Sequence, residues 1–360
     1  MNQLNSQSTA QSSSAPLLTV LVPIYNASPY LRQALDSLAH QTLRDLEILC
    51  INDGSTDDSL AIIKSYQASD PRFRLLDKPN TGYGDSMNQG IKLARGRYIG
   101  ILEPDDWLEL DAFSRLTQLA EWHRAEVVKA NYFKELATTS STASKTTSTT
   151  APAPQSPKTT KTLKTSEIRP RDTGKLIDPR HDRRVFTFAP AIWSAIYRRD
   201  FLLDHHLEFL PTPGASYQDL GFSFKVWTLA RRVVLTDAAY YHYRLDNANS
   251  SVHSPGKANC VVEEYASVHQ FLADHHLLTE FGHTAAAAKF RNYHWNLQRL
   301  SPDLARPFYR TMYSELKAAA AAGFLHRADF SPAHWAALQL ILKNPDLAYH
   351  LLRLRSRLKS

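Results

Sequence analysis

Cysteine is scarce in this chain: Cys50 and Cys260 are the only two among 360 residues. Two cysteines exclude a disulfide scaffold and a cysteine-based zinc site, and they fit a reducing compartment. Long apolar runs are also missing, because no run approaches the roughly 18–20 residues that a membrane-spanning helix needs. The Ser/Gln-rich stretch 1–16 lacks the basic-then-apolar order of a secretory signal, and we expect it to be disordered. These absences predict a soluble, cytoplasmic protein.

The positive charge is confined to two segments. The chain carries +7 in total, of which residues 137–184 contribute +6 and residues 343–360 contribute +4, leaving −3 for the remainder. A nucleic-acid-binding protein would ordinarily spread basic and aromatic residues over one folded face. We therefore expect no nucleic-acid partner.

The first third of the chain alternates between strand and helix patterns. Segments with helical spacing, such as Leu31, Leu35 and Leu38 after Pro29, separate short apolar runs of strand length. These runs are residues 17–24, 46–51, 73–76, 98–102 and 127–133. The alternation predicts an α/β fold with a doubly wound, mostly parallel sheet and helices on both faces. Ligands of such sheets bind beyond the carboxyl ends of the strands.

The composition changes at residue 138. Residues 138–166 are almost entirely Thr, Ser, Ala, Pro and Lys, which bury too little apolar surface to fold, so we predict a disordered insertion. Order should resume near Val185. We expect one or two strands over 186–198, a helix over 218–231, paired strands over 233–244, and helices from about residue 256. The predicted divisions are 1–16 (disordered), 17–137 (first half of the sheet domain), 138–184 (low-complexity insertion), 185–255 (second half) and 256–360 (helical C-terminal subdomain).

Polar side chains gather where the predicted strands end. Glu103, Asp105 and Asp106 follow the fourth apolar run, and Asp53 follows the second. Like charges crowded in a crevice are costly unless a cation or a proton relieves them. Oxygen ligands favour Mg²⁺ or Mn²⁺, which often bridge to the phosphates of a nucleotide. The residues alone predict a metal-dependent enzyme that acts on a nucleotide diphosphate.

Four blocks in this half resemble a known family. They are the turn Pro23-x-Tyr25-Asn26, the block Asn-Asp-Gly-Ser-Thr-Asp at 52–57, the Asn-x-Gly loop at 80–82, and the acidic strand end at 103–106. In this order and spacing the chain resembles a family 2 glycosyltransferase with the GT-A fold, of the type that makes bacterial surface polysaccharides. The resemblance implies a nucleotide-sugar donor, with UDP favoured, a divalent metal, and transfer with inversion at the anomeric carbon.

The resemblance also implies roles for single residues. Pro23 and Tyr25 would line the base pocket, Asp53 would accept a hydrogen bond from the base or ribose, and Asp105 would ligate the metal. The family has Asp where this chain has Glu103, a longer side chain that still reaches the ribose or the metal. The whole donor-side set is Pro23, Tyr25, Asn26, Asp53, Gly82, Asn88, Glu103, Asp106 and Arg244.

Three members of this set keep a second interpretation. Asp106 is either a supporting carboxylate or sugar contact, or part of a solvated turn. Gly82 either lets the backbone approach the donor or only supplies turn geometry. Arg244 lies in a segment that resembles the one closing over the donor in the family, where it would contact the diphosphate; the alternative is a surface salt bridge.

A base is needed on the acceptor side, because inversion requires that the attacking hydroxyl lose its proton. The family has an acidic pair before a helix; here Gln218 replaces the first acid and Asp219 opens an amphipathic helix. We assign Asp219 as the general base, the alternative being a carboxylate that stabilises the helix dipole. Trp193, in a predicted strand, is a candidate for stacking on an acceptor sugar or a core tryptophan.

The tail has a helical pattern with Leu347, Leu351, Leu354 and Leu358 on one face and basic residues around it. This pattern suits a helix on an anionic membrane surface, or one packed on the protein with a solvated basic side. The expected acceptor is a glycan or a lipid-linked molecule. The sequence thus predicts an inverting glycosyltransferase. The alternative is a catalytically silent nucleotide-sugar or glycan-binding module, which the departures at Glu103 and Gln218 keep open.

Overall fold

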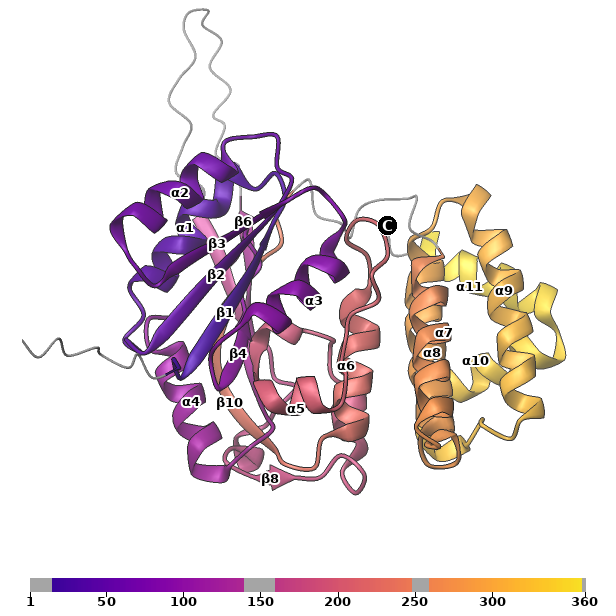
Figure 1. The fold of residues 1–360 in the computed structure, drawn as a ribbon. Helices are drawn as coiled ribbons and strands as arrows, with labels where there is room; N and C mark the ends of the chain where they lie inside the picture. Colours follow the sequence, from indigo (N-terminus) through magenta and orange to yellow (C-terminus); the bar gives the residue numbers. More distant parts are fainter. Residues whose placement is uncertain (1–14, 139–158, 248–258, 358–360) are drawn as a thin grey trace, which may run out of the picture.

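A computed structural model describes residues 15–138, 159–247 and 259–357 of the chain (Figure 1). Within them one sheet follows the order β3-β2-β1-β4-β9-β6-β10-β5, with β7 beside β6 and β8 beside β10. The strands are β1 (Leu18–Ile24), β2 (Leu46–Asp53), β3 (Phe73–Lys78), β4 (Tyr98–Ile101), β5 (Trp107–Leu108), β6 (Val127–Thr138), β7 (Thr159–Lys164), β8 (Leu176–Ile177), β9 (Ala195–Arg198) and β10 (Val233–Arg244).

The parallel part of the sheet sets the position of the crevice. β1 pairs in parallel with β2 and β4, and β3 pairs in parallel with β2, so the carboxyl ends of these four strands share one edge. Every residue of β1 and β2 is buried, as expected for central strands with both faces covered. β9 and β5 run antiparallel to their neighbours. The prediction of a mostly parallel α/β sheet is confirmed.

Helices cover both faces of the sheet. The apolar faces of α1, α2 and α4 pack into one buried cluster, and those of α3, α5 and α6 pack into the other. The helices are α1 (Ser28–Ala39), α2 (Ser59–Ser69), α3 (Tyr83–Leu93), α4 (Ala112–His123), α5 (Arg199–Asp204), α6 (Gln218–Leu229), α7 (Cys260–Asp274), α8 (Leu278–Arg299), α9 (Pro302–Ala321), α10 (Pro332–Lys343) and α11 (Pro345–Arg357). The two clusters make the arrangement doubly wound.

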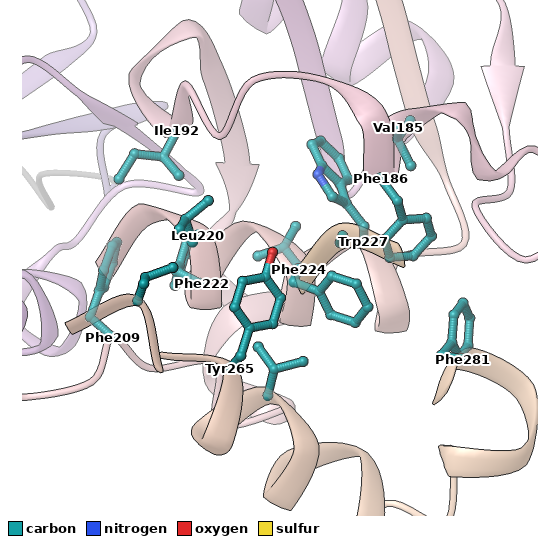
Figure 2. Close-up of a cluster of buried hydrophobic side chains, with 14 of the residues drawn as sticks. Val185, Phe186, Ile192, Phe209, Leu220, Phe222, Phe224, Trp227, Tyr265 and Phe281 are labelled. Carbon is teal, nitrogen blue, oxygen red and sulfur yellow. The ribbon is translucent and has the colours of Figure 1, made fainter. Parts of the chain in front are cut away.

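The C-terminal helices share a core with the sheet. Figure 2 shows Phe224 of α6 among Phe186, Tyr265 and Phe281, which come from a 3₁₀ turn, α7 and α8. The Phe186 ring centroid lies 5.0 Å from that of Phe224 and 5.6 Å from that of Phe281. One buried cluster therefore runs from the sheet through α6 into α7–α11. The predicted helical C-terminal part is present and is packed directly against the sheet domain.

The insertion is shorter than the sequence predicted. Residues 139–158 lie outside the described residues, as do residues 1–14 of the predicted N-terminal tail. The prediction of disorder up to residue 166 was wrong. β7 pairs antiparallel with the C-terminal end of β6, from Phe133↔Lys164 to Thr138↔Thr159. Strand pairing uses backbone hydrogen bonds and suits threonine, so it needs no apolar composition.

The elements before and after α6 also differ in detail from the prediction. Residues 183–187 and 192–194 form 3₁₀ turns, and only β9 is a strand, so Trp193 lies in a turn. The expected paired strands over 233–244 are the single strand β10, whose register against β6 shifts twice. The expected helix over 218–231 is confirmed as α6. No helix of the described residues is both long and apolar enough to cross a membrane.

Two glycines bring the halves of the sheet domain together. Gly82, the N-cap of α3, has φ +97°, and Gly84 lies in the first turn of α3. A Cβ on Gly84 would lie 2.2 Å from the carbonyl oxygen of Leu210, and one on Gly82 would lie 2.8 Å from that of Thr212. The amide of Tyr83 also donates to the carbonyl of Gly214 (3.0 Å). The start of α3 thus packs backbone to backbone on the loop that precedes α6.

We expect Gly84→Ala to destabilise the fold by about 1–3 kcal/mol. Alanine would otherwise favour a helix over glycine, so the loss must come from the clash with Leu210. Urea unfolding followed by circular dichroism measures the change. Gly323→Ala is the control, since a Cβ there meets nothing within 4 Å and strains only the backbone (φ +74°). A Gly84→Ala variant as stable as the native chain would contradict this account.

Candidate active site

Three carboxylates stand at the carboxyl edge of the sheet, in the turn between β4 and β5. Glu103 and Asp105 are half-buried, and Asp106 is 1% exposed. The hydroxyl of Tyr83, from α3, donates to Oε1 of Glu103 (2.7 Å). The sequence predicts that these three acids lie together after the fourth strand, and they do so in the structure.

The end of β10 holds this acidic turn. The hydroxyl of Tyr241 donates to Oδ2 of Asp106 (2.7 Å) and accepts from the backbone N–H of Glu103 (3.1 Å). The backbone N–H of Arg244 donates to Oδ1 of Asp106 (2.7 Å). Both carboxylate oxygens of Asp106 therefore accept hydrogen bonds from other residues of the protein. This arrangement favours the supporting role of Asp106 over a solvated turn.

Burial and mutual repulsion raise the pKa of two of these acids. Burial raises the pKa of Glu103 to about 8, and the charges of Asp105 and Asp219 add to the effect. Burial, with Asp105 next, raises the pKa of Asp106 well above its usual value, although the hydrogen bonds from Arg244 and Tyr241 oppose the shift. Among the described residues, no Lys or Arg side chain forms an ion pair with Glu103, Asp105 or Asp106. The raised pKa values favour the protonated, uncharged forms of Glu103 and Asp106, which limits the repulsion at this edge of the sheet.

Asp105 is the member of the three that faces the segment after β10. Its Oδ2 accepts from the side-chain amide of Asn247 (2.7 Å), and its carbonyl accepts from Nε of Arg244 (2.8 Å). The Arg244 guanidinium also lies 4.9 Å from the ring centroids of both Tyr30 and Trp107 and donates to Gln33 (2.6 Å). These contacts fix Arg244 beside the acidic turn, and its guanidinium also lies 3.8 Å from Asp246, as the alternative of a salt bridge predicts. Its predicted diphosphate contact stays a prediction.

Asp219 opens α6, with its carboxylate half-buried. Burial raises the pKa of Asp219 to about 6, and the hydrogen bond that its carboxylate accepts from the backbone N–H of Leu220 (2.9 Å) opposes this shift. The charge of Asp219 helps to raise the pKa of Glu103. The charges of Asp219 and of all three acids in the turn help to raise the pKa of Tyr243. The structure therefore brings Asp219 within electrostatic range of the acidic turn.

Gln218, the departure from the family pattern, fixes the loop before α6. It is 2% exposed; its Oε1 accepts from the backbone N–H of Ser216, and its Nε2 donates to Thr212 Oγ1 (2.9 Å) and to the carbonyl of Gly214 (3.2 Å). A carboxylate could not donate these last two bonds. Glutamine therefore suits this position structurally, and Asp219 remains the acid that faces the crevice.

Trp193 lies in the 3₁₀ turn over residues 192–194, next to β9. Nζ of the buried Lys129 donates to the carbonyl of Ala191 (2.6 Å) and to Ser194 Oγ (2.6 Å), one residue or two from Trp193. The indole stacks on Tyr241 (4.2 Å between ring centroids) and on Tyr243 (5.2 Å). Trp193 is half-buried, so it has features of both predicted roles, and acceptor stacking stays a prediction.

On the donor side, the first two strand ends are joined through Asn26. Pro23 is buried at the end of β1, whereas Tyr25 is 53% exposed, so its ring is accessible for stacking. Asn26 has φ +50°, and its Oδ1 accepts from the backbone N–H of Thr56 (2.8 Å). Asn26 thus shapes the loop, and its predicted donor contact stays a prediction.

Asp53 organises the glycine loop. Its carboxylate accepts from the backbone N–H groups of Thr81 (2.9 Å) and Gly82 (3.0 Å) and pairs with the largely buried side chain of Lys78. Asn88 is 8% exposed. Its side-chain amide donates to the backbone carbonyl of Phe209 (2.9 Å) and accepts from the backbone N–H of the same residue (2.8 Å). These contacts do not favour a direct donor contact for Asn88, which instead ties α3 to the loop before α6.

Several residues of the site were missed from the sequence. Tyr241 and Tyr243 alternate along β10 and so face one side of the sheet, which was the available signal. Lys78 gave no signal, whereas Asn247 lies in the segment 243–247 that resembles the one closing over the donor, although its contact with Asp105 was not predicted. Glu264, on α7, is 1% exposed, with neither oxygen hydrogen-bonded in the described structure, and burial raises its pKa to about 8. It lies against Gly221, two residues after Asp219.

The donor set fits a hard divalent cation. Asp105 and Glu103 offer carboxylate oxygens, the ligands that Mg²⁺ and Mn²⁺ prefer. Burial raises the pKa of Glu103 most, and the charges of Asp105 and Asp219 add a repulsion that a bound cation would relieve. The Asn247 amide, which now donates to Asp105, would have to turn aside. These residues are compatible with the predicted metal.

Comparisons with known proteins agree with this picture. The family model described as glycosyl transferase family 2 matches residues 19–186. The chain is 30% identical over 248 residues to an uncharacterized glycosyltransferase EpsJ of Bacillus subtilis (strain 168), covering 67% of this chain and 64% of EpsJ. It is 43% identical over 97 residues to a chondroitin synthase of Escherichia coli, covering 27% of this chain and 14% of that protein. A crystal structure of S. aureus TarS 1–349 with UDP-GlcNAc aligns with a TM-score of 0.49 at 18% identity, covering 80% of this chain and 82% of that one.

The chain spans just under two thirds of the length of the first curated relatives that it matches, with 64%, 61% and 65% covered. The family match ends at residue 186, before Trp193, Asp219 and Arg244. The alignment with EpsJ covers 248 residues, 67% of this chain, so it extends beyond the part that the family model matches. The family model itself covers only the donor-side residues before 187.

We expect Glu103→Gln to change how stability depends on pH. The pKa of Glu103 rises from 4.5 to about 8 on folding, so its contribution to stability is full below pH 4.5 and is lost as the pH rises to about 8. Glutamine cannot ionise and still accepts from Tyr83. The variant should therefore gain stability relative to the native chain across this pH window.

Urea unfolding at a series of pH values measures the difference. Glu263→Gln, an exposed glutamate on α7, is the control and should run parallel to the native chain. Parallel curves for Glu103→Gln as well would show that burial does not hold this carboxyl protonated.

Proposed function

Residues 19–186 belong to the glycosyl transferase family 2, and from this premise we propose that the protein is an inverting, metal-dependent glycosyltransferase. It moves a sugar from a nucleotide-diphosphate sugar, with UDP favoured, to a hydroxyl of a glycan or a lipid-linked acceptor. Relatives named as polysaccharide synthases favour a role in surface polysaccharide synthesis.

The observation that carries this proposal is the arrangement of Asp219 and the acidic turn. Asp219 comes from α6, and the acids come from the turn after β4, yet Tyr83 contacts both regions. Its hydroxyl donates to Glu103 (2.7 Å), and its backbone N–H donates to the carbonyl of Gly214 (3.0 Å), in the loop that leads to Asp219. A donor at the acidic edge and an acceptor at Asp219 would therefore lie close to each other. Single-displacement transfer needs this opposition of base and leaving group.

Asp219 supplies the base. A carboxyl with a pKa of about 6 is mostly ionised at neutral pH and holds a proton better than an ordinary aspartate. It takes the proton of the acceptor hydroxyl while the hydroxyl oxygen bonds to the anomeric carbon. The bond from that carbon to the diphosphate oxygen breaks, and its electron pair leaves with the nucleotide.

Asp105 and Glu103 are the residues that would hold Mg²⁺ or Mn²⁺. When bound, the ion supplies positive charge to the departing diphosphate. Tyr25 offers an exposed ring for the base. Asp53 acts through the loop that it pins, so its part in donor binding includes positioning of Gly82.

The rival proposal is a silent nucleotide-sugar or glycan-binding module. The departures that suggested it each have a structural reason: Glu103 reaches Tyr83, and Gln218 holds the loop before α6. Neither removes Asp105 or Asp219 from the crevice. We therefore favour the enzyme.

Two substitutions separate binding from turnover. We expect UDP to raise the melting temperature only with Mn²⁺, since a ligand of the folded state stabilises by mass action. Asp105→Asn should abolish that metal-dependent shift. Asp219→Asn should keep it and lower the rate of UDP release from a panel of UDP-sugars with glycan acceptors by about 10²–10⁴-fold, the usual worth of a general base.

Asp200→Asn is the matched control, an exposed aspartate in the first turn of α5. It should leave both measurements unchanged. Stabilisation by UDP and Mn²⁺ with turnover unaffected by Asp219→Asn would refute the base assignment. Nucleotide binding without turnover in the native chain would favour the silent module.

We also propose that α11 attaches the protein to an anionic membrane surface. Leu347, Leu351 and Leu354 are 47%, 44% and 54% exposed, whereas Ala348 and Leu352 face the protein core. The helix is therefore packed on one side and presents leucines on another, which combines the two alternatives left open by the sequence. Leu358 lies outside the described residues. The net charge of +4 over residues 343–360 suits anionic lipids.

The double variant Leu347→Ser/Leu351→Ser should bind vesicles of phosphatidylcholine and phosphatidylglycerol about tenfold more weakly than the native chain, because binding scales with buried apolar area. Co-sedimentation measures this, and vesicles of phosphatidylcholine alone should bind little of either. Leu93→Ser/Leu110→Ser, at exposed leucines elsewhere, is the control. Equal sedimentation of all three proteins would rule out attachment through α11.

A further inference from the structure

The start of α6, which carries Asp219, is tied directly to the C-terminal helices. Tyr217, the N-cap of α6, has φ +59°, and its hydroxyl donates to Oδ1 of Asn296 on α8 (3.0 Å). Asn296 is 3% exposed. A left-handed backbone is unusual for tyrosine. This backbone conformation and the hydrogen bond to Asn296 together fix the position of the Tyr217 ring.

Trp295 stands beside that anchor. It is 45% exposed, and its ring meets the Tyr217 ring edge to face, with 6.3 Å between centroids. The Arg299 guanidinium lies 4.1 Å from the Trp295 ring centroid, one helical turn on. The indole is thus held between two neighbours while much of its surface remains in contact with solvent.

An exposed tryptophan by itself needs no explanation, but the position of Trp295 does. Tyr217 lies two residues before Asp219, a distance of at most about 7 Å along the chain. The phenol of Tyr217 is also within electrostatic range of both Asp219 and Arg299. A row of neighbouring side chains therefore runs from Asp219, across Tyr217, to the indole of Trp295 on α8.

Resting on the proposed function, we propose that Tyr217 and Trp295 form a subsite for a glycan acceptor, which binds the sugar unit next to the one that reacts at Asp219. The apolar face of a pyranose ring packs on an aromatic face, and a rigid aromatic contributes contact area at little entropic cost. The subsite gives the C-terminal helices a part in the selection of acceptors with at least two sugar units.

The chain offers a matched control for this subsite. Trp122, on α4, is 84% exposed and belongs to a helix on the other face of the sheet. Trp122→Ala and Trp295→Ala therefore make the same chemical change at exposed sites. Trp295→Phe retains an aromatic face and should restore most of the binding.

Saturation-transfer NMR tests the subsite with hexasaccharides of glucose, N-acetylglucosamine, hyaluronan and galacturonate as probes. We expect at least one to bind the native chain and Trp122→Ala equally, and to bind Trp295→Ala about tenfold more weakly, the usual loss for a central aromatic. In turnover, Trp295→Ala should raise KM for that acceptor with kcat little changed.

Nucleotide binding distinguishes the two proposals. If UDP with Mn²⁺ stabilises the chain but no probe binds, or if Trp295→Ala binds as well as the native chain, the subsite is refuted and the proposed enzyme stands. If a probe binds through Trp295 but no nucleotide binds, the subsite stands as a glycan-binding site and the proposed enzyme is refuted. Circular dichroism confirms that each variant is folded.

Discussion

The geometry of the site depends on one close contact between backbones, where the start of α3 meets the loop that precedes α6. Gly84 allows this approach because any side chain would strike Leu210. The same loop is held from the other side by Gln218, and Asp53 pins the turn that leads into α3. The position of Asp219 relative to the acidic turn follows from this contact. A substitution here would act at a distance on both the donor and the acceptor side.

Burial of carboxyl groups in and near the acidic turn is energetically unfavourable for the folded state. Burial raises the pKa of Glu103 to about 8 and that of Asp219 to about 6, and each carboxyl would be more stable in water. Tyrosine hydroxyls and backbone N–H groups satisfy part of the demand, as at Asp106. Carboxyl groups with pKa values raised by burial are common where a protein must bind a cation or hold a proton. The electrostatics therefore agree with the chemistry that we propose.

The parallel sheet and its carboxyl edge could be predicted from the sequence because burial on both faces leaves continuous apolar runs, as in β1 and β2. β7 could not, since its pairing with β6 depends on backbone groups that composition does not reveal. Within the site, the acids after β4 follow from local order along the chain. The roles of Asn88 and Lys78 do not, because both depend on contacts with partners that only the folded chain brings near.

The C-terminal helices share one buried core with the sheet. Phe224 packs on Phe186, which in turn packs on Phe281 of α8, so α6 cannot shift without moving its neighbours. Tyr217 adds a hydrogen bond to α8 at the catalytic end of α6. A base that opens a helix braced on both sides keeps a fixed direction, which general-base catalysis requires. If Asp219 is the base that we propose, the helices after residue 259 help to hold it in place, although the family model ends at residue 186.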